Sequence, residues 1–100
     1  MQEALARLWT KFLPEIENRL ALLELAAHSM NAGLLADEDR EAAHQAAHKL
    51  AGVLGTFGLH RGTELARQVE VGLAEKIPAV TAADLSSWVS ELRLLIEHRK

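Results

Sequence analysis

The stretch AAHQAAHKLAGVLGTFGL, residues 42–59, decides the fold because it reads as a helix with one buried face. At about 100° per residue, its apolar side chains fall within one broad arc. The residues of this arc are Ala43, Ala46, Ala47, Leu50, Leu54 and Phe57. His48 lies almost opposite the centre of the arc, so we expect its imidazole to be exposed to solvent.

The neighbours of His48 on that exposed face are small. His44 lies one turn before it, and Gly52 and Gly55 follow within two turns. A glycine inside a helix costs about 0.5–1 kcal/mol relative to alanine, so two of them on a solvated face need a physical reason. Either a bulky partner must approach the imidazole closely, or the glycines allow a neighbouring helix to pack tightly. The sequence leaves both explanations open.

The residues before this stretch predict two helices. An apolar stripe at helical spacing predicts a short helix over about residues 2–13. The residues of this stripe are Leu5, Leu8, Trp9 and Phe12. Pro14 then suits the first turn of a second helix, where its missing N–H is no loss, and Gly33 is a suitable stop.

The residues from position 37 onward predict three more helices. Acidic residues 37–39 favour the start of the helix that contains the opening stretch, which we expect to end near Gly58. A fourth helix is predicted over about residues 59–77, before Pro78. Its inward residues are expected to be Leu65, Val69, Leu73 and Ile77. Thr81 and Asp84 form a capping signal for a fifth helix, whose apolar stripe runs from residue 85 to residue 96.

Short connections between long amphipathic helices favour antiparallel neighbours. We therefore predict an all-α, antiparallel, up-down-up-down four-helix bundle over about residues 14–99. The short N-terminal helix over about 2–13 is expected to cover one end of the bundle. Residues 1–100 are interpreted as a single domain.

Composition and charge exclude several classes of protein. The 100 residues are 49% hydrophobic and 25% charged, which is typical of a globular domain. Cysteine is absent, so no disulfide or thiolate metal site is possible. The net charge of −3 argues against nucleic-acid binding. No apolar run approaches the roughly 20 residues of a membrane span, and no signal peptide is recognisable, so we expect a cytoplasmic protein.

The segment AHKLAGVLGTFG, residues 47–58, resembles the signature of histidine-containing phosphotransfer (HPt) domains of two-component relays. That signature is A-H-x-L-K-G, with another glycine six residues later. The matching positions are Ala47, His48, Leu50, Gly52 and Gly58. The run TELARQVE, residues 63–70, is similar to a downstream L-x-x-x-(L/V)-E segment of the family. At position 51 the family usually has lysine, and this chain has alanine.

The resemblance implies that His48 accepts a phosphoryl group from the aspartate of a receiver domain and donates it back. The receiver would belong to a response regulator or a hybrid histidine kinase and would supply Mg²⁺. We expect no cofactor bound by this chain, a monomer, and no kinase activity, because no ATP-binding loop is recognisable. A neutral imidazole suits this role because it is nucleophilic near pH 7.

The expected site extends around His48. Gln45, Lys49 and Gly52 are expected to surround the phosphoryl group, with Gln45 and Lys49 reaching in from the flank. The residues expected to contact the receiver are His44, Ala51, Gly55 and Leu59. Leu59 could equally begin the next helix and turn inward.

Two alternatives compete with phosphotransfer. A non-catalytic helical module could dock a receiver without accepting phosphate, and Ala51 in place of the usual lysine favours it. His44 and His48 could bind a metal ion from one helix face. Two ligands without an H-E-x-x-H motif do not make a site, however, so we predict no metal.

Overall fold

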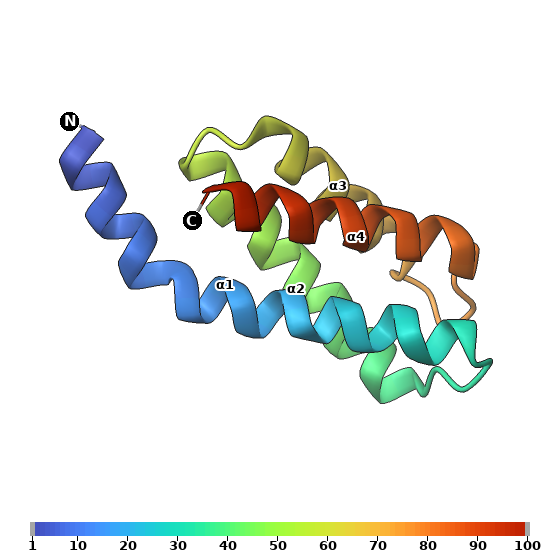
Figure 1. The fold of residues 1–100 in the computed structure, drawn as a ribbon. Helices are drawn as coiled ribbons and strands as arrows, with labels where there is room; N and C mark the ends of the chain where they lie inside the picture. The colour runs from blue at the N-terminus through green and yellow to red at the C-terminus, as the bar shows by residue number, and fades with distance from the viewer. Residues whose placement is uncertain (1, 100) are drawn as a thin grey trace.

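A computed structural model describes residues 2–99, and these residues form four helices and no strand. The helices are α1 (Gln2–Asn31), α2 (Asp37–Thr56), α3 (His60–Gly72) and α4 (Ala82–Arg99). Helices α1 and α3 each pack against both α2 and α4, which closes a bundle of 44 × 20 × 18 Å (Figure 1). The predicted all-α four-helix bundle is confirmed.

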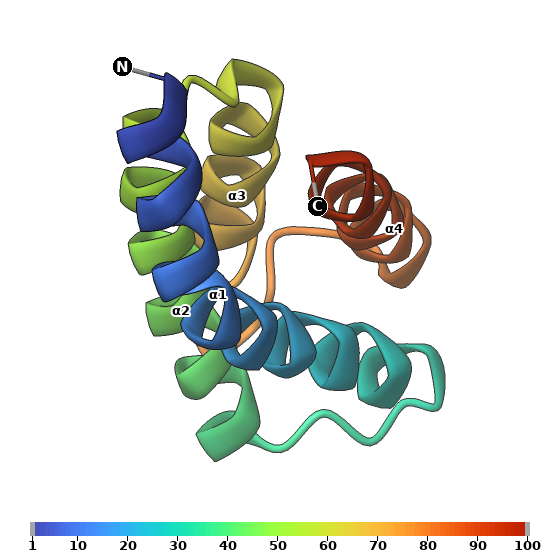
Figure 2. The same ribbon diagram turned by 60° about the vertical axis from the view of Figure 1, so that its left-hand side comes forward.

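The predicted break at Pro14 is wrong, because α1 continues through this residue as one helix of 30 residues. A proline inside a helix removes one backbone hydrogen bond and bends the axis. Figures 1 and 2 show α1 changing direction within its N-terminal half. Trp9 on one side of the bend and Ile16 on the other are both buried in the common core. Packing on both sides of the proline therefore maintains a helix that Pro14 would otherwise end.

The end of the fourth predicted helix is also corrected. Helix α3 ends at Gly72, and Ile77, which was expected to face inward, is 85% exposed. A Cβ atom added at Gly72 would lie 2.9 Å from the Val80 Cβ, so the glycine lets the 73–81 connection fold back against the helix. The Ala79 N–H donates to the Gly72 carbonyl at 2.9 Å and fixes that turn. Leu73 remains buried as predicted.

The buried face of α2 matches its sequence pattern. All six residues of the predicted arc are buried, from Ala43 to Phe57. Phe57 also meets Trp9 edge-on, with ring centroids 5.2 Å apart, which joins the end of α2 to the first half of α1. Leu8 departs from its predicted stripe, since 42% of its surface is exposed.

Local signals fix two of the connections. The Asp84 N–H donates to the Thr81 hydroxyl at 3.1 Å, which confirms the predicted cap of α4. After α2, Gly58 adopts φ +74°, and the Leu59 N–H donates to the Leu54 carbonyl at 2.9 Å. Glycine is favoured where the chain reverses in this left-handed conformation. The turn sends α3 back alongside α2, and Figure 2 shows the two helices side by side.

Candidate functional site

His48 projects from the middle of α2 into solvent, and 68% of its side-chain surface is exposed. Its helix is held firmly beneath it, because Ala47 and Leu50 are fully buried in the core. A ring on the open face of a packed helix combines access with a fixed position. The exposure predicted from the helical pattern is therefore confirmed.

One ring nitrogen of His48 is already occupied. The distance from His48 Nδ1 to Glu70 Oε2 on α3 is 2.7 Å. An ionised carboxylate can only accept a hydrogen bond, so Nδ1 carries the hydrogen and donates it. The Nε2 atom of the neutral ring then keeps its lone pair. This arrangement leaves the outer nitrogen of His48 as a nucleophile.

Three hydrogen bonds between α2 and α3 set the relative position of these groups. The Thr63 hydroxyl donates to the Ala51 carbonyl at 3.0 Å; Ala51 lies within one turn of His48 on α2, and Thr63 lies two turns before Glu70 on α3. The Glu70 carbonyl accepts a hydrogen bond from His44 Nδ1 at 2.8 Å. Glu70 thus contacts both histidines, one through its backbone and the other through its side chain. The half-buried His44 ring acts as a link between the helices.

A hollow of about 250 Å³ lies beside the His48 ring. It is lined by His48, Ala51, Gly52, Arg67 and Glu70. Ala51 is 5% exposed and forms part of the base of the hollow instead of an open rim. The two glycines differ in their surroundings. A Cβ added at Gly52 would meet nothing within 4 Å, whereas one at Gly55 would lie 3.3 Å from the Thr63 hydroxyl.

Because the two glycines have different surroundings, a different explanation applies to each of them. Gly55 lies close to α3, which fits the packing explanation. Gly52 has open space before it, so helix packing does not require a glycine there. Gly52 instead leaves the approach to the His48 ring uncovered, which fits the explanation based on access.

The other predicted site residues lie outside the hollow. The exposed Gln45 amide donates to Glu41 at 3.1 Å, and this hydrogen bond lowers the pKa of the Glu41 carboxyl. The exposed Lys49 side chain forms no hydrogen bond or ion pair with any residue between 2 and 99. Leu59 is half-buried against the core, so its side chain is only partly available as an outward contact.

Two residues of the hollow were missed from the sequence, namely Glu70 and Arg67. Both belong to the run TELARQVE, residues 63–70, which was compared with a segment of the family, but none of its residues was assigned to the site. Placing that run antiparallel to α2 across the short turn would have brought these two side chains toward His48. The missing information was the register between the two helices.

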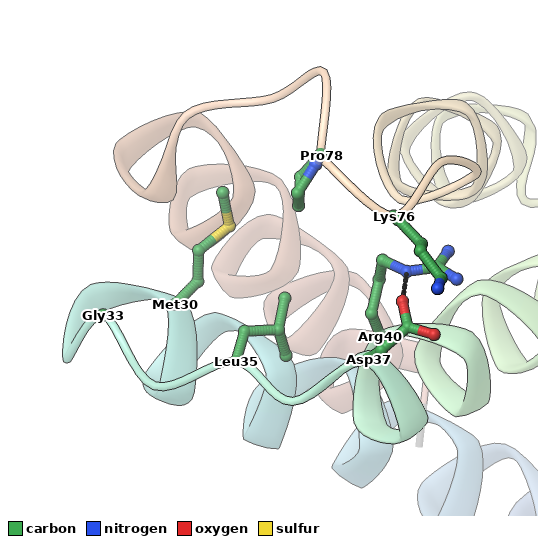
Figure 3. Close-up of a pocket in the computed structure, with 7 residues that line it drawn as sticks. All are labelled: Met30, Gly33, Leu35, Asp37, Arg40, Lys76 and Pro78. Atoms are coloured by element: carbon green, nitrogen blue, oxygen red, sulfur yellow. Dashed lines mark hydrogen bonds and ion pairs between the residues drawn. The ribbon is translucent and has the colours of Figure 1, made fainter.

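A second cavity, of about 350 Å³, lies near the start of α2, where the 32–36 and 73–81 connections meet (Figure 3). The buried Arg40 borders it and donates to Asp37 at 2.8 Å, which lowers the pKa of Asp37. Arg40 also bonds to Glu41 and to the Leu73 carbonyl. These bonds join the start of α2 to the end of α3, so Arg40 has a structural role.

The metal alternative concerns His44 and His48, which lie one turn apart on α2. No group of three histidine, aspartate or glutamate residues in the 2–99 range is placed to hold a metal ion. The Nδ1 atoms of His44 and His48 both face Glu70.

A protein-family model described as "Hpt domain" matches residues 7–98, which is nearly the whole chain. The chain belongs to the Hpt domain family. Hpt domains are helical bundles that carry out histidine phosphotransfer in phosphorelays of two-component signalling. The predicted recognition, made on residues 47–58 and 63–70, is confirmed over a much longer segment.

A curated relative of this Hpt domain is Protein RcaC of Microchaete diplosiphon, which is 30% identical over 92 residues. The aligned segment covers 90% of this chain and 14% of that protein. The chain therefore spans about a seventh of the length of the relative it matches. No solved structure matches the chain.

Among the helices described here, between residues 2 and 99, none combines the length and the apolar character needed to cross a bilayer.

Proposed function

We propose that His48 accepts a phosphoryl group from the aspartate of a receiver domain and donates it back to such an aspartate. The observation that supports this most directly is the exposed His48 ring with its Nδ1 bonded to Glu70. That bond leaves Nε2 free, and Nε2 is the atom that a second protein can reach. The receiver would supply Mg²⁺, and this chain would need no cofactor of its own.

The proposed step balances as a simple exchange of bonds. The Nε2 lone pair of His48 attacks the phosphorus atom, and a bond between nitrogen and phosphorus forms. The bond from phosphorus to the aspartyl oxygen breaks, and the freed carboxylate takes its electron pair. The ring becomes cationic as it gains the phosphoryl group, and the Glu70 carboxylate stabilises the hydrogen on Nδ1. The reverse step returns the phosphoryl group to a receiver.

Receiver docking is proposed over the face of α2 around the ring. His44, Gly55 and Leu59 are the expected contacts at its edge, and Ala51 would lie beneath them. A monomer suffices for this arrangement, because α2 and α3 of one chain provide every residue of the hollow. A cytoplasmic location, where receivers would meet the domain, remains a prediction.

Glu70 provides a prediction about rate. Replacing Glu70 with alanine should slow phosphoryl acceptance by about tenfold, since the hydrogen bond of an exposed charged group contributes at the lower end of 1.5–3 kcal/mol. Rapid-quench labelling from a phosphorylated receiver measures the rate. Glu64→Ala on the same helix is the matched control, and its rate should stay at the wild-type value. A Glu70→Ala protein as fast as wild type would show that the Nδ1 bond has no part in the reaction.

The direct test is incubation of the protein with a phosphorylated receiver and Mg²⁺. We expect label that is labile in acid and stable in base, as a phosphohistidine is, and mass spectrometry should assign it to His48. The non-catalytic alternative predicts a different pattern. Across several receivers that bind the chain, no label would be transferred, and that result would replace our proposal with a docking module.

A further inference from the structure

A phosphoryl group that enters the hollow beside His48 brings negative charge close to a carboxylate. Near pH 7 such a group carries close to two negative charges, and the Glu70 carboxylate already lies 2.7 Å from the ring. Ala51 and Gly52 bring no charge to the lining. Two like-charged groups in one small space destabilise each other unless a cation lies between or beside them.

Arg67 is the cationic residue among the five that line the hollow. Its place on α3 follows from the hydrogen bonds between the helices. Thr63, one turn before it, bonds to the Ala51 carbonyl, and Glu70, nearly one turn after it, bonds to His48. Arg67 therefore lies across from the segment between His48 and Gly52, which is the segment that a phosphoryl group on Nε2 would face.

The Arg67 guanidinium is also available for a new partner. Five of the six other arginines are engaged with carboxylates or with a ring; they are Arg19, Arg40, Arg61, Arg93 and Arg99. The Arg67 side chain is exposed and forms no hydrogen bond or ion pair with any other part of the described chain. A guanidinium offers five N–H donors in a planar fork that matches two phosphoryl oxygens at once.

We propose that Arg67 binds the phosphoryl oxygens of phosphorylated His48 and stabilises the phosphorylated state. This inference rests on the proposed function and adds the residue that supplies the positive charge. It also replaces the expectation that Lys49 or Gln45 fills that role, because neither lines the hollow. Glu70 then binds the imidazole ring of His48, and Arg67 binds the phosphoryl group that the ring carries.

The equilibrium constant for transfer from a phosphorylated receiver isolates this contact. It depends only on the stabilities of the free phosphorylated and unphosphorylated proteins, so it is independent of how the receiver docks. Arg67→Gln should lower this constant about fivefold, the size expected for a charged contact at an exposed site. Arg67→Lys should lower it less, because the charge is kept. High salt should reduce the difference between wild type and Arg67→Gln.

Lys49→Gln is the matched control, because Lys49 is an exposed cation next to His48 in sequence but outside the hollow. Its equilibrium constant should equal that of wild type. An unchanged constant in Arg67→Gln would overturn the inference, even if the transfer rate fell. An equal loss in Lys49→Gln would also overturn it, since general surface charge would then be the cause. If wild type itself takes no label, the proposed function fails and this inference fails with it.

A second measurement uses NMR. The Nε–H resonance of Arg67 should shift when His48 is phosphorylated with phosphoramidate, a small donor that needs no docking surface. An unmoved resonance in fully phosphorylated protein would contradict the contact. The free energy of unfolding should be nearly the same in wild type and Arg67→Gln, because the side chain has no partner to lose.

Discussion

A protein in which His48 is replaced by glutamine is expected to take no label from a phosphorylated receiver. The glutamine amide nitrogen has no nucleophilic lone pair, so the bond to phosphorus cannot form. The side chain is 68% exposed, and substitutions at such positions usually change the free energy of unfolding by less than about 0.5 kcal/mol. The measurement is label per protein after incubation with phospho-receiver and Mg²⁺, beside a urea unfolding curve.

His44→Gln is the control for this experiment. His44 lies one turn away on the same helix, and its Nδ1 bonds to the Glu70 carbonyl. We expect His44→Gln to accept label, with some loss of stability from the broken link between α2 and α3. Label that persists in His48→Gln would place the acceptor at another histidine and reject the assignment of His48.

Gly52→Gln is expected to reduce transfer from a receiver by about 100-fold, because even a misplacement of about 1 Å between reacting groups costs that much. The glutamine would project into the open space before the hollow, where an added Cβ meets nothing within 4 Å. The fold should tolerate it and gain up to about 1 kcal/mol from better helix propensity. Labelling by phosphoramidate should stay within about twofold of wild type, since a small donor needs little space.

Gly52→Ala separates bulk from helix propensity. Alanine gives most of the propensity gain and adds only one carbon, so receiver transfer should remain close to wild type. Wild-type transfer in Gly52→Gln would refute the access explanation of this glycine. An equal loss of labelling with phosphoramidate and with receiver would instead indicate that the substitution changes the position or reactivity of the His48 ring.

The exposure of His48 could be predicted from the sequence because it depends on local geometry alone. Within one helix, a residue's direction follows from its position at about 100° per residue, and a strong apolar arc identifies the core side. The caps at Thr81 and after Thr56 were equally local. Features decided within one helix or one turn were therefore predicted well.

Features that depend on packing between elements were predicted poorly. Pro14 carries a strong local signal for a helix start, and burial of Trp9 and Ile16 on both sides of it overrides that signal. The extension of α3 to Ile77 failed for a similar reason. Close contact between Gly72 and Val80 ends the helix early, and no periodicity in the sequence records that contact.

The partners of His48 depend on the register between two helices. Periodicity gives the face of α3 but not its axial position beside α2. Glu70 and Arg67 reach the hollow because the turn at 57–59 and the bonds from Thr63 and His44 fix that position. The same register explains why Lys49, adjacent to His48 in sequence, lies outside the hollow.

The residues that form the hollow all come from α2 and α3, and α1 and α4 provide none of them. The proposed chemistry therefore belongs to the hairpin of α2 and α3, and α1 and α4 support that hairpin. Substitutions on the outer surfaces of α1 and α4 can alter the stability of the bundle, or its contacts with other polypeptides, without disturbing the proposed phosphotransfer. Sequence drift should accordingly be tolerated more readily in the supporting half than between His44 and Glu70.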